Sequence, residues 1–346
     1  MSEIANDARV SRQSRMAAGL LFALASAASF GLSGSLARGL LEQGWSAGAA
    51  VTARVLLAAL VLVVPALVAL RGRWMLLRES AGLVLAYGLV AVAGCQLSYF
   101  FAVSYMQVGV ALLIEYTAPV AVLAWMWLRH GQRPTRRTIV GAGIAAVGLV
   151  LVLDLLSGAS LSLPGVLWAL GAMVGAATYF ILSADEDNGL PPIVLAAGGL
   201  TAGGVGLLLA GLIGILPMRA STADVAFRGV TVPWWLPVAA LGVVTAAIAY
   251  VTGIAASRRL GSRLASFVAL TEVVAALVFA WLLLGELPGW VQGIGGLLIV
   301  GGVVLVKLGE PRLAVGEAEA ATPAQVAAPE APSDGSFPHR RAAAGR

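Results

Sequence analysis

Hydrophobic positions in this chain come in long unbroken stretches rather than in short amphipathic patterns. A helix needs about 20 mostly apolar residues to cross the roughly 30 Å of hydrocarbon in a bilayer. The stretches lack the alternation typical of a transmembrane β-barrel, and in lipid a helix satisfies its backbone within its own segment. The pattern therefore predicts an all-α membrane protein with ten transmembrane helices. The expected spans are residues 17–37, 48–70, 81–103, 108–128, 138–156, 164–183, 193–217, 234–256, 262–284 and 290–307.

Composition supports a membrane protein. Hydrophobic residues make up 60% of the chain and charged residues 11%, against about 25% charged in an ordinary globular domain. A soluble protein of 346 residues would lack the polar side chains for its surface. The first span follows the basic segment "MSEIANDARVSRQSRM", which a signal peptide could also have. The apolar run is longer than a signal peptide needs and nine more spans follow, so an uncleaved span is favoured.

The distribution of basic residues predicts the orientation of the chain. With residues 1–16 as a cytoplasmic N-terminus, 18 of the 22 lysines and arginines fall on the cytoplasmic side and 3 on the other, with Arg54 inside a span. The positive-inside rule then places both termini in the cytoplasm of a multi-pass protein, which we expect in a bacterial plasma membrane. This asymmetry also explains the basic composition without a nucleic-acid partner. Residues 308–346 are rich in Ala, Pro and Glu, which predicts a disordered cytoplasmic tail.

The two halves of the chain match at a shift of 154 positions. The matched pairs are Trp127 and Trp281, Pro134 and Pro288, Gly141 and Gly295, and Gly148 and Gly302. The chain therefore reads as a duplication, with a first five-span repeat at 17–156 and a second at 164–307. An odd number of spans per repeat inverts the second copy. Inverted repeats are typical of secondary transporters, whose site lies near the midplane between the halves.

Two glutamates fall inside predicted spans. At 1.5 Å per residue, Glu115 lies roughly 10 Å and Glu272 roughly 15 Å into its span. Both are then within about 5 Å of the midplane, where a charge costs about 2.5–3.5 kcal/mol. We expect them to face one cavity lined from both repeats, where a carboxyl can bind a substrate ammonium or carry a coupling proton. The alternative is that each carboxyl only joins helices.

Two further residues are unusual inside spans. Pro119 removes the hydrogen bond to the carbonyl of Glu115 and kinks the helix, which predicts either a hinge or a static bend. For Arg54 we predict a structural role, in which it pairs with Glu115 or extends outward to the interface.

Polar side chains in other spans can bind a solute or join helices. Gln96 and Tyr99 share a face of the third span, and Tyr179 and Tyr250 lie in the sixth and eighth spans. Cys95 is the single cysteine, so no internal disulfide can form.

Other classes of function find little support. The two histidines, His130 and His339, lie in a loop and in the tail, and no HExxH motif is present, so no metal site is expected. The glycine-rich runs lack a Walker lysine and a preceding strand, so no nucleotide or other cofactor is expected. A membrane-embedded enzyme or a non-transporting receptor remains an alternative of a different class.

Three segments resemble a known family. They are "RVLLAALVLV", "IEYTAPVAVLAW" and "LASFVALTEVVAALVFAWLLLGELPGWVQGIGGLLIVGG". With them, residues 17–307 resemble the EamA-type carriers of the drug/metabolite transporter superfamily. The segment "EYTAP" is similar to the threonine and homoserine exporters of that family. The chain departs from the family pattern at Val273, where a proline is common, and at Gly131 and Gln132, which replace the "GE" of the second repeat.

The resemblance implies a secondary active transporter that exports a small polar metabolite, such as an amino acid, by alternating access. A proton is the expected coupling ion. An uncoupled facilitator or a multidrug exporter is the alternative within transport. The expected partners are the lipid bilayer and a small-molecule substrate, and the sequence leaves open whether the chain forms a homodimer.

Overall fold

A computed structural model describes residues 2–106, 108–153 and 162–309, so almost all of the predicted tail at 308–346 lies outside the described residues. The first half contains α1 (Ser2–Glu42), α2 (Ala47–Leu70), α3 (Trp74–Glu79), α4 (Ala81–Ala86), the π-helix η1 (Tyr87–Gly94), α5 (Cys95–Tyr105), α6 (Val108–Glu115), α7 (Ala118–His130) and α8 (Arg136–Val152). The second half contains α9 (Leu163–Ala184), α10 (Pro192–Leu212), β1 (Val225–Phe227), β2 (Val230–Val232), α11 (Trp235–Gly242), the π-helix η3 (Val243–Ile248), α12 (Ala249–Ala269), α13 (Thr271–Phe279), the π-helix η4 (Ala280–Leu284) and α14 (Trp290–Gly309).

Local signals explain where several helices begin and end. The side chains of Ser46, Thr135 and Ser162 cap α2, α8 and α9 by accepting hydrogen bonds from backbone N–H groups three residues later. Gly131 ends α7 in a left-handed conformation with φ of 66°, which glycine adopts without steric cost. The helix ends are therefore encoded by short polar and glycine signals between the apolar runs.

Eight helical segments within the described residues are long and apolar enough to cross a membrane. This is fewer than the ten predicted, for two reasons. α8 has 17 residues, because the predicted span at 138–156 stops being helical at Leu153. The eighth predicted span is joined to the start of the ninth, because helix continues from Trp235 to Ala269 across Gly261, which has non-helical angles (φ 79°, ψ 159°). The rest of the ninth, Thr271–Leu284, is a separate apolar helix that is too short to be counted.

The long connection between α10 and α11 contains a small β-hairpin that the all-helical prediction missed. β1 and β2 pair antiparallel, with Phe227 opposite Val230. The two turn residues Arg228 and Gly229 both have positive φ, of 44° and 84°, as a two-residue hairpin turn requires. The pattern "VAFRGVTV" carries this signal, with β-branched residues on both sides of an Arg-Gly turn. The predicted span at 193–217 also ends earlier, since α10 stops at Leu212.

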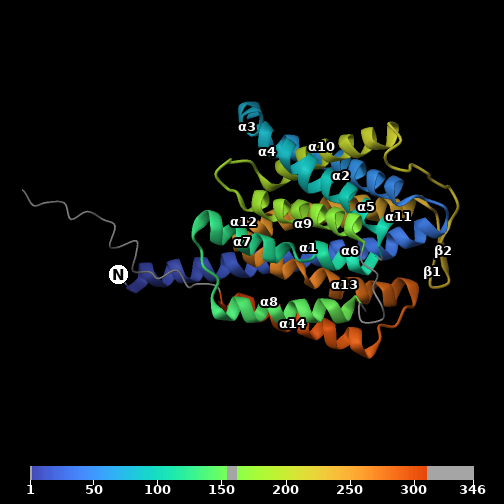
Figure 1. The fold of residues 1–346 in the computed structure, drawn as a ribbon. Coiled ribbons are helices and arrows are strands. Elements are labelled where there is room, and N and C mark those ends of the chain that lie inside the picture. Colours follow the sequence, from blue (N-terminus) through green and yellow to red (C-terminus); the bar gives the residue numbers. More distant parts are fainter. Residues whose placement is uncertain (1, 107, 154–161, 310–346) are drawn as a thin grey trace, which may run out of the picture. The chain divides into compact units, whose positions relative to one another are not determined.

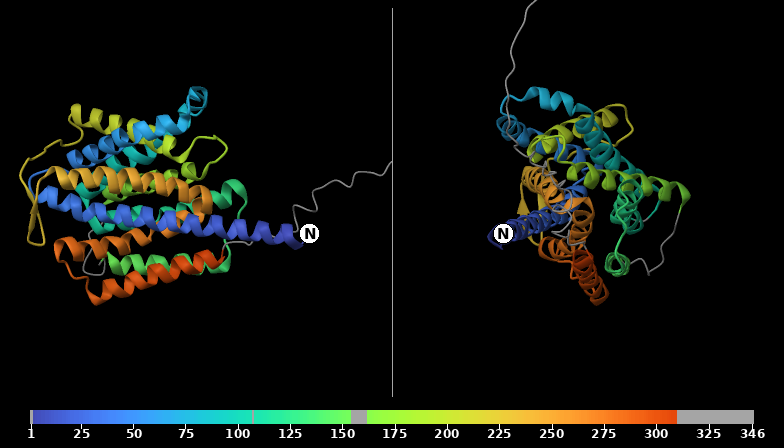
Figure 2. Two further views of the ribbon diagram at one scale, coloured as in Figure 1. Left: turned by 180° about the vertical axis from the view of Figure 1, so that it is seen from behind. Right: turned by 90° about the vertical axis from the view of Figure 1, so that its left-hand side faces the viewer.

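The helix contacts repeat between the two halves. α1 packs against α12 and α13, and α9, its counterpart, packs against α5, α6 and α7. α2 packs against α10, and α8 packs against α14. Figure 1 shows α8 and α14 side by side, and the view from behind in Figure 2 agrees. These contacts of one half therefore have counterparts in the other.

Glycines allow α8 and α14 to approach closely. A Cβ on Gly141 would lie 2.7 Å from the carbonyl oxygen of Gly302, and one on Gly302 would lie 2.6 Å from the carbonyl oxygen of Gly141. Gly148 and Gly295 face each other in the same way, at 2.6 and 2.7 Å. Because Gly141 meets Gly302 and Gly148 meets Gly295, the two helices run antiparallel. Small residues in such positions let helix backbones pack in contact.

Candidate functional site

A cavity of about 810 Å³ lies between helices of both halves. Its walls come from α1, α2, α5, α6 and α7 of the first half and from α9, α12 and α13 of the second. The eight polar or kink residues singled out from the sequence all line it: Arg54, Gln96, Tyr99, Glu115, Pro119, Tyr179, Tyr250 and Glu272. The structure thus brings together residues that are up to 218 positions apart in the sequence.

A break in the fourth helical segment places Glu115 in the cavity. α6 ends at Glu115 and α7 begins at Ala118, with Pro119 in the first turn. The hydroxyl of Thr117 donates to the carbonyl of Ile114 at 2.6 Å and so partners a carbonyl at the end of α6. The predicted kink is present, and it lies directly after the buried carboxyl. A role as a hinge remains a proposal.

The second half has the same break without a proline. α12 ends at Ala269 and α13 begins at Thr271, whose hydroxyl donates to the carbonyl of Val268 at 2.7 Å. The backbone N–H of Val273, at the position that corresponds to Pro119, donates to Leu270 three residues back. This break was not predicted from the sequence, because Val273 permits a continuous helix.

Glu115 lies against the third and sixth helical segments. The thiol of Cys95 is 3.6 Å from Glu115 Oε1 and 3.4 Å from the carbonyl oxygen of Ala172. Gly175 lets α9 approach, since a Cβ there would lie 2.6 Å from Cys95 Cβ. The neighbour of the carboxyl is thus a weak donor, which leaves its oxygens available to the cavity.

Glu272 lies in the first turn of α13, where the positive end of the helix dipole favours a carboxylate. The hydroxyl of Tyr116 donates to Glu272 Oε1 at 3.3 Å. Gly31 of α1 packs against the same turn, since a Cβ there would lie 2.7 Å from the carbonyl oxygen of Glu272. The carboxyl of the second half is therefore held by a residue of the first.

Arg54 forms part of another wall of the cavity. Its Nη2 donates to the carbonyl of Thr245 at 2.8 Å, and its guanidinium carbon lies 5.5 Å from the ring centre of Phe30. No ion pair joins it to Glu115 within the described residues, so that alternative for Arg54 is wrong. The carbonyl of Thr245 is available because η3 replaces the usual hydrogen-bonding pattern of an α-helix there.

Aromatic rings form the apolar part of the cavity wall. The rings of Tyr179 and Tyr250 lie 5.6 Å apart and nearly perpendicular, and Phe30 lies 5.2 Å from Tyr250. Gly253 makes room for this arrangement, because a Cβ there would lie 1.9 Å from the hydroxyl oxygen of Tyr179. Such edge-to-face contacts hold the rings in fixed positions.

Sequence reasoning did not select three residues of the site, which are Cys95, Tyr116 and Phe30. Tyr116 stands beside Glu115 in the sequence, so its proximity to the site was available as a signal. Cys95 and Phe30 carry no charge and fall in ordinary apolar runs, so only the packing of the helices reveals them.

The cavity reaches one end of the helices. Its lining extends to Leu41 at the end of α1, Ala47 at the start of α2, Val103 in α5 and Val108 at the start of α6. Leu41 is 40% exposed, so the lining continues to the surface. This end of the helices is the one that carries the connections after α1 and α5.

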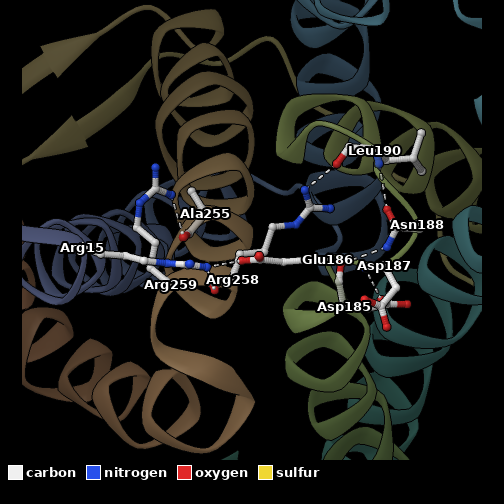
Figure 3. A network of polar contacts seen from close by, with 9 residues as sticks. All are labelled: Arg15, Asp185, Glu186, Asp187, Asn188, Leu190, Ala255, Arg258 and Arg259. Atoms are coloured by element: carbon white, nitrogen blue, oxygen red, sulfur yellow. Dashed lines mark hydrogen bonds and ion pairs between the residues drawn. The ribbon is translucent and has the colours of Figure 1, made fainter. Parts of the chain in front are cut away.

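A polar network occupies the other end, some 26 residues earlier along α1 (Figure 3). Arg15 of α1 forms an ion pair with Glu186 at 2.8 Å and donates to the carbonyl of Arg258 at 3.2 Å. Arg258 of α12 in turn donates to the carbonyl of Leu190. Nearby, Arg263 donates to Gln132 at 2.6 Å. These contacts tie α1, α12 and the loops after α7 and α9 to one another.

Among the described residues, no three His, Cys, Asp or Glu side chains come together as a metal site. The chemistry of the cavity is that of carboxyl, phenol and guanidinium groups on an apolar wall.

A family model matches both halves. The EamA-like transporter family matches residues 17–154 and again residues 163–308. This chain belongs to the EamA-like transporter family. It is therefore a multi-pass membrane transporter with two EamA units, in a family of transporters rather than enzymes, and the resemblance read from its sequence is confirmed. The cavity lies where the two EamA units meet.

A comparison with curated proteins gives no match. A solved structure described as "Crystal structure of protein" has a similar fold, with a TM-score of 0.66 and 20% sequence identity. The similarity covers 85% of this chain and 98% of that chain. At this identity the likeness concerns the fold alone.

Proposed function

We propose that this EamA-like transporter is a secondary carrier that exports a small polar metabolite, such as an amino acid, in exchange for protons. The observation that carries the proposal is the meeting of Glu115 and Glu272 in one cavity built by both EamA units. A charge at membrane depth costs several kcal/mol without a partner, so two carboxyls there favour a ligand or proton that neutralises them. One charge moved through 100 mV is worth about 2.3 kcal/mol, which is enough to drive accumulation.

We infer that the two units, at 17–156 and 164–307, have five spans each and opposite topology. α8 and the helical segments on either side of Gly261 supply the spans beyond the eight that length and composition identify. Gly302 stands 154 positions after Gly148, and Gly295 stands 154 positions after Gly141. The contact between Gly141 and Gly302 is thus repeated with the roles exchanged, as a two-fold axis between antiparallel helices requires. This relation supports inverted repeats.

Alternating access follows from the two ends of the cavity. The lining of the cavity reaches Leu41 and Val108 at one end of the helices. At the other end, the polar network of Arg15, Glu186 and Arg258 connects the helices and loops to one another. With the orientation that the basic residues predict, the network lies at the cytoplasmic end, together with both termini, in a bacterial plasma membrane. Transport would require the network to separate while the opposite end closes. The breaks at Thr117 and Leu270 supply flexible points beside both carboxyls.

A second candidate is an exporter of organic cations. The aromatic lining, with Phe30, Tyr179 and Tyr250, favours it, because aromatic faces attract cations and a carboxylate binds them. A facilitator without proton coupling would use the same cavity.

The test is counterflow of labelled threonine and a panel of amino acids and amines in vesicles, with and without a pH gradient. We expect gradient-dependent flux in the wild type and in Glu79→Gln, which changes an exposed carboxyl outside the cavity. We expect Glu115→Gln to lose that flux while its thermal unfolding in detergent is unchanged. Flux that does not depend on the pH gradient would favour a facilitator without proton coupling. Flux of amines but not of amino acids would favour the organic-cation exporter.

A further inference from the structure

The guanidinium of Arg54 lines the cavity but makes few hydrogen bonds to the described residues. A guanidinium carries five N–H donors, and the structure gives that of Arg54 one hydrogen bond within the described residues, from Nη2 to the carbonyl of Thr245. Its Nε is buried and has no partner there. The side chain lines the cavity, so the remaining N–H groups of its two Nη atoms are available to a ligand, whereas Nε is buried.

Within the described residues, no carboxyl forms an ion pair with Arg54. Glu272 lines the same cavity, but the structure shows no ion pair between these two described residues, and Glu272 accepts its hydrogen bond from Tyr116. Glu115 lies on another wall, beside Cys95. The surroundings of Arg54, whose guanidinium carbon lies over the ring of Phe30, make an unpaired guanidinium costly. The site is therefore incomplete without an anionic group.

We infer that Arg54 binds the carboxylate of the substrate, so that the cavity selects amino acids over amines of the same shape. The planar fork of a guanidinium matches a carboxylate through two parallel hydrogen bonds. Glu272, which lines the same cavity and is held by Tyr116, then receives the ammonium group of the same molecule. The aromatic wall of Phe30, Tyr179 and Tyr250 takes the side chain. The inference rests on the proposed function and goes beyond it by giving a binding role to a residue that otherwise only joins α2 to η3.

The test compares probes that differ by the carboxylate alone. L-Threonine is paired with 1-amino-2-propanol, and L-phenylalanine with 2-phenylethylamine. Binding is measured as protection of Cys95, the chain's only cysteine, from alkylation by a maleimide, because this thiol lines the same cavity. Loss of hydrogen bonds to a charged group corresponds to about a ten- to hundredfold loss of affinity. We therefore expect the wild type to prefer each amino acid over its amine by that factor.

Arg54→Gln should abolish the preference, and Arg54→Lys, which keeps the charge but not the fork, should reduce it. The ratio between paired probes is the deciding number, since a loss of stability alone would weaken both probes together. Equal binding of amino acid and amine by the wild type would overturn the inference, whether or not the variants fold. An unchanged ratio in a folded Arg54→Gln would overturn it as well. Lack of protection by any probe would instead contradict the amino-acid substrate proposed above.

Discussion

The hydroxyl of Tyr116, in the first EamA unit, donates a hydrogen bond to Glu272 of the second unit at 3.3 Å. This contact joins the two units through the cavity itself. A hydrogen bond to a charged acceptor contributes about 1.5–3 kcal/mol at good geometry, and less at this distance.

Tyr116→Phe removes this donor and keeps the ring. We expect a fall in transport rate of about fivefold, equivalent to about 1 kcal/mol, because Glu272 is no longer held in place. Initial rates in vesicles measure the effect, with Tyr105→Phe as control, since Tyr105 is 53% exposed at the end of α5. Equal rates for the wild type and Tyr116→Phe would show that the contact has no part in transport.

The glycine contact between α8 and α14 predicts where an added methyl group is tolerated. Gly302→Ala places a Cβ 2.6 Å from the carbonyl oxygen of Gly141, so the helices must separate. We expect a destabilisation of about 1–3 kcal/mol, as for other overpacked sites.

Gly301→Ala and Gly143→Ala are matched controls on the same two helices, because a Cβ at either position meets nothing within 4 Å. Alanine at such helix positions is worth about 0.5–1 kcal/mol more than glycine, so these variants should be at least as stable as the wild type. Thermal unfolding in detergent decides between the outcomes. If Gly302→Ala unfolds at the temperature of its control, the close packing is not required.

Pro119 is predicted to be replaceable. The corresponding Val273 has a backbone N–H, which donates to the carbonyl of Leu270, and the helix is still interrupted there. In Pro119→Ala we therefore expect the new N–H to bond to Tyr116, with the break and the position of Glu115 preserved. The change in stability should be about 1 kcal/mol or less.

Flux and thermal unfolding of Pro119→Ala test this expectation together. The matched variant is Thr117→Val, which leaves the carbonyl of Ile114 without its 2.6 Å partner. We expect it to lose more activity than Pro119→Ala. The reverse order would assign the break, and any motion at it, to the proline.

The network of Figure 3 predicts a shift in accessibility. The pair of Arg15 and Glu186 is about half exposed, so it is worth about 0–1 kcal/mol, and its loss changes the ratio of two conformations by up to about fivefold. In Glu186→Gln we expect faster alkylation of Cys95 by an impermeant maleimide added from the side of the network. Asp187→Asn, an exposed change in the same loop, should alkylate like the wild type. Slower or equal alkylation of Glu186→Gln would mean that the pair does not hold this end closed.

Much of the fold could be predicted from the sequence, because every apolar segment that crosses lipid must satisfy its backbone hydrogen bonds as a helix. The run at 48–70 matches α2 within one residue, and the run at 290–307 matches α14 within two. The site was also partly readable, because charges such as Glu115 and Glu272 are costly in lipid and must face a cavity or a partner. The fixed shift of 154 positions between the halves indicated that the two glutamates would face the same cavity.

The remainder depended on packing. At the break at Leu270, a threonine hydroxyl and a backbone N–H donate to carbonyls three residues earlier. The hydropathy of this segment is the same as that of a regular transmembrane helix, so hydropathy does not indicate the break. The suggested pairing of Arg54 with Glu115 was wrong, because nothing in the sequence indicates that Arg54 would donate to the carbonyl of Thr245 in η3. The hairpin at Val225–Phe227 and Val230–Val232 lies outside the apolar runs, where the requirement that a segment in lipid be helical does not apply.

We propose that the carboxyls of one shared cavity couple substrate transport to protons. Substrate flux and proton movement should be measured together, in the same vesicles, for the wild type, Glu115→Gln and Glu272→Gln. We expect the wild type to move protons and substrate in a fixed ratio, and a folded Glu115→Gln to lose the coupled proton movement. Substrate flux in the wild type without proton movement, or an unchanged ratio in both glutamine variants, would contradict it.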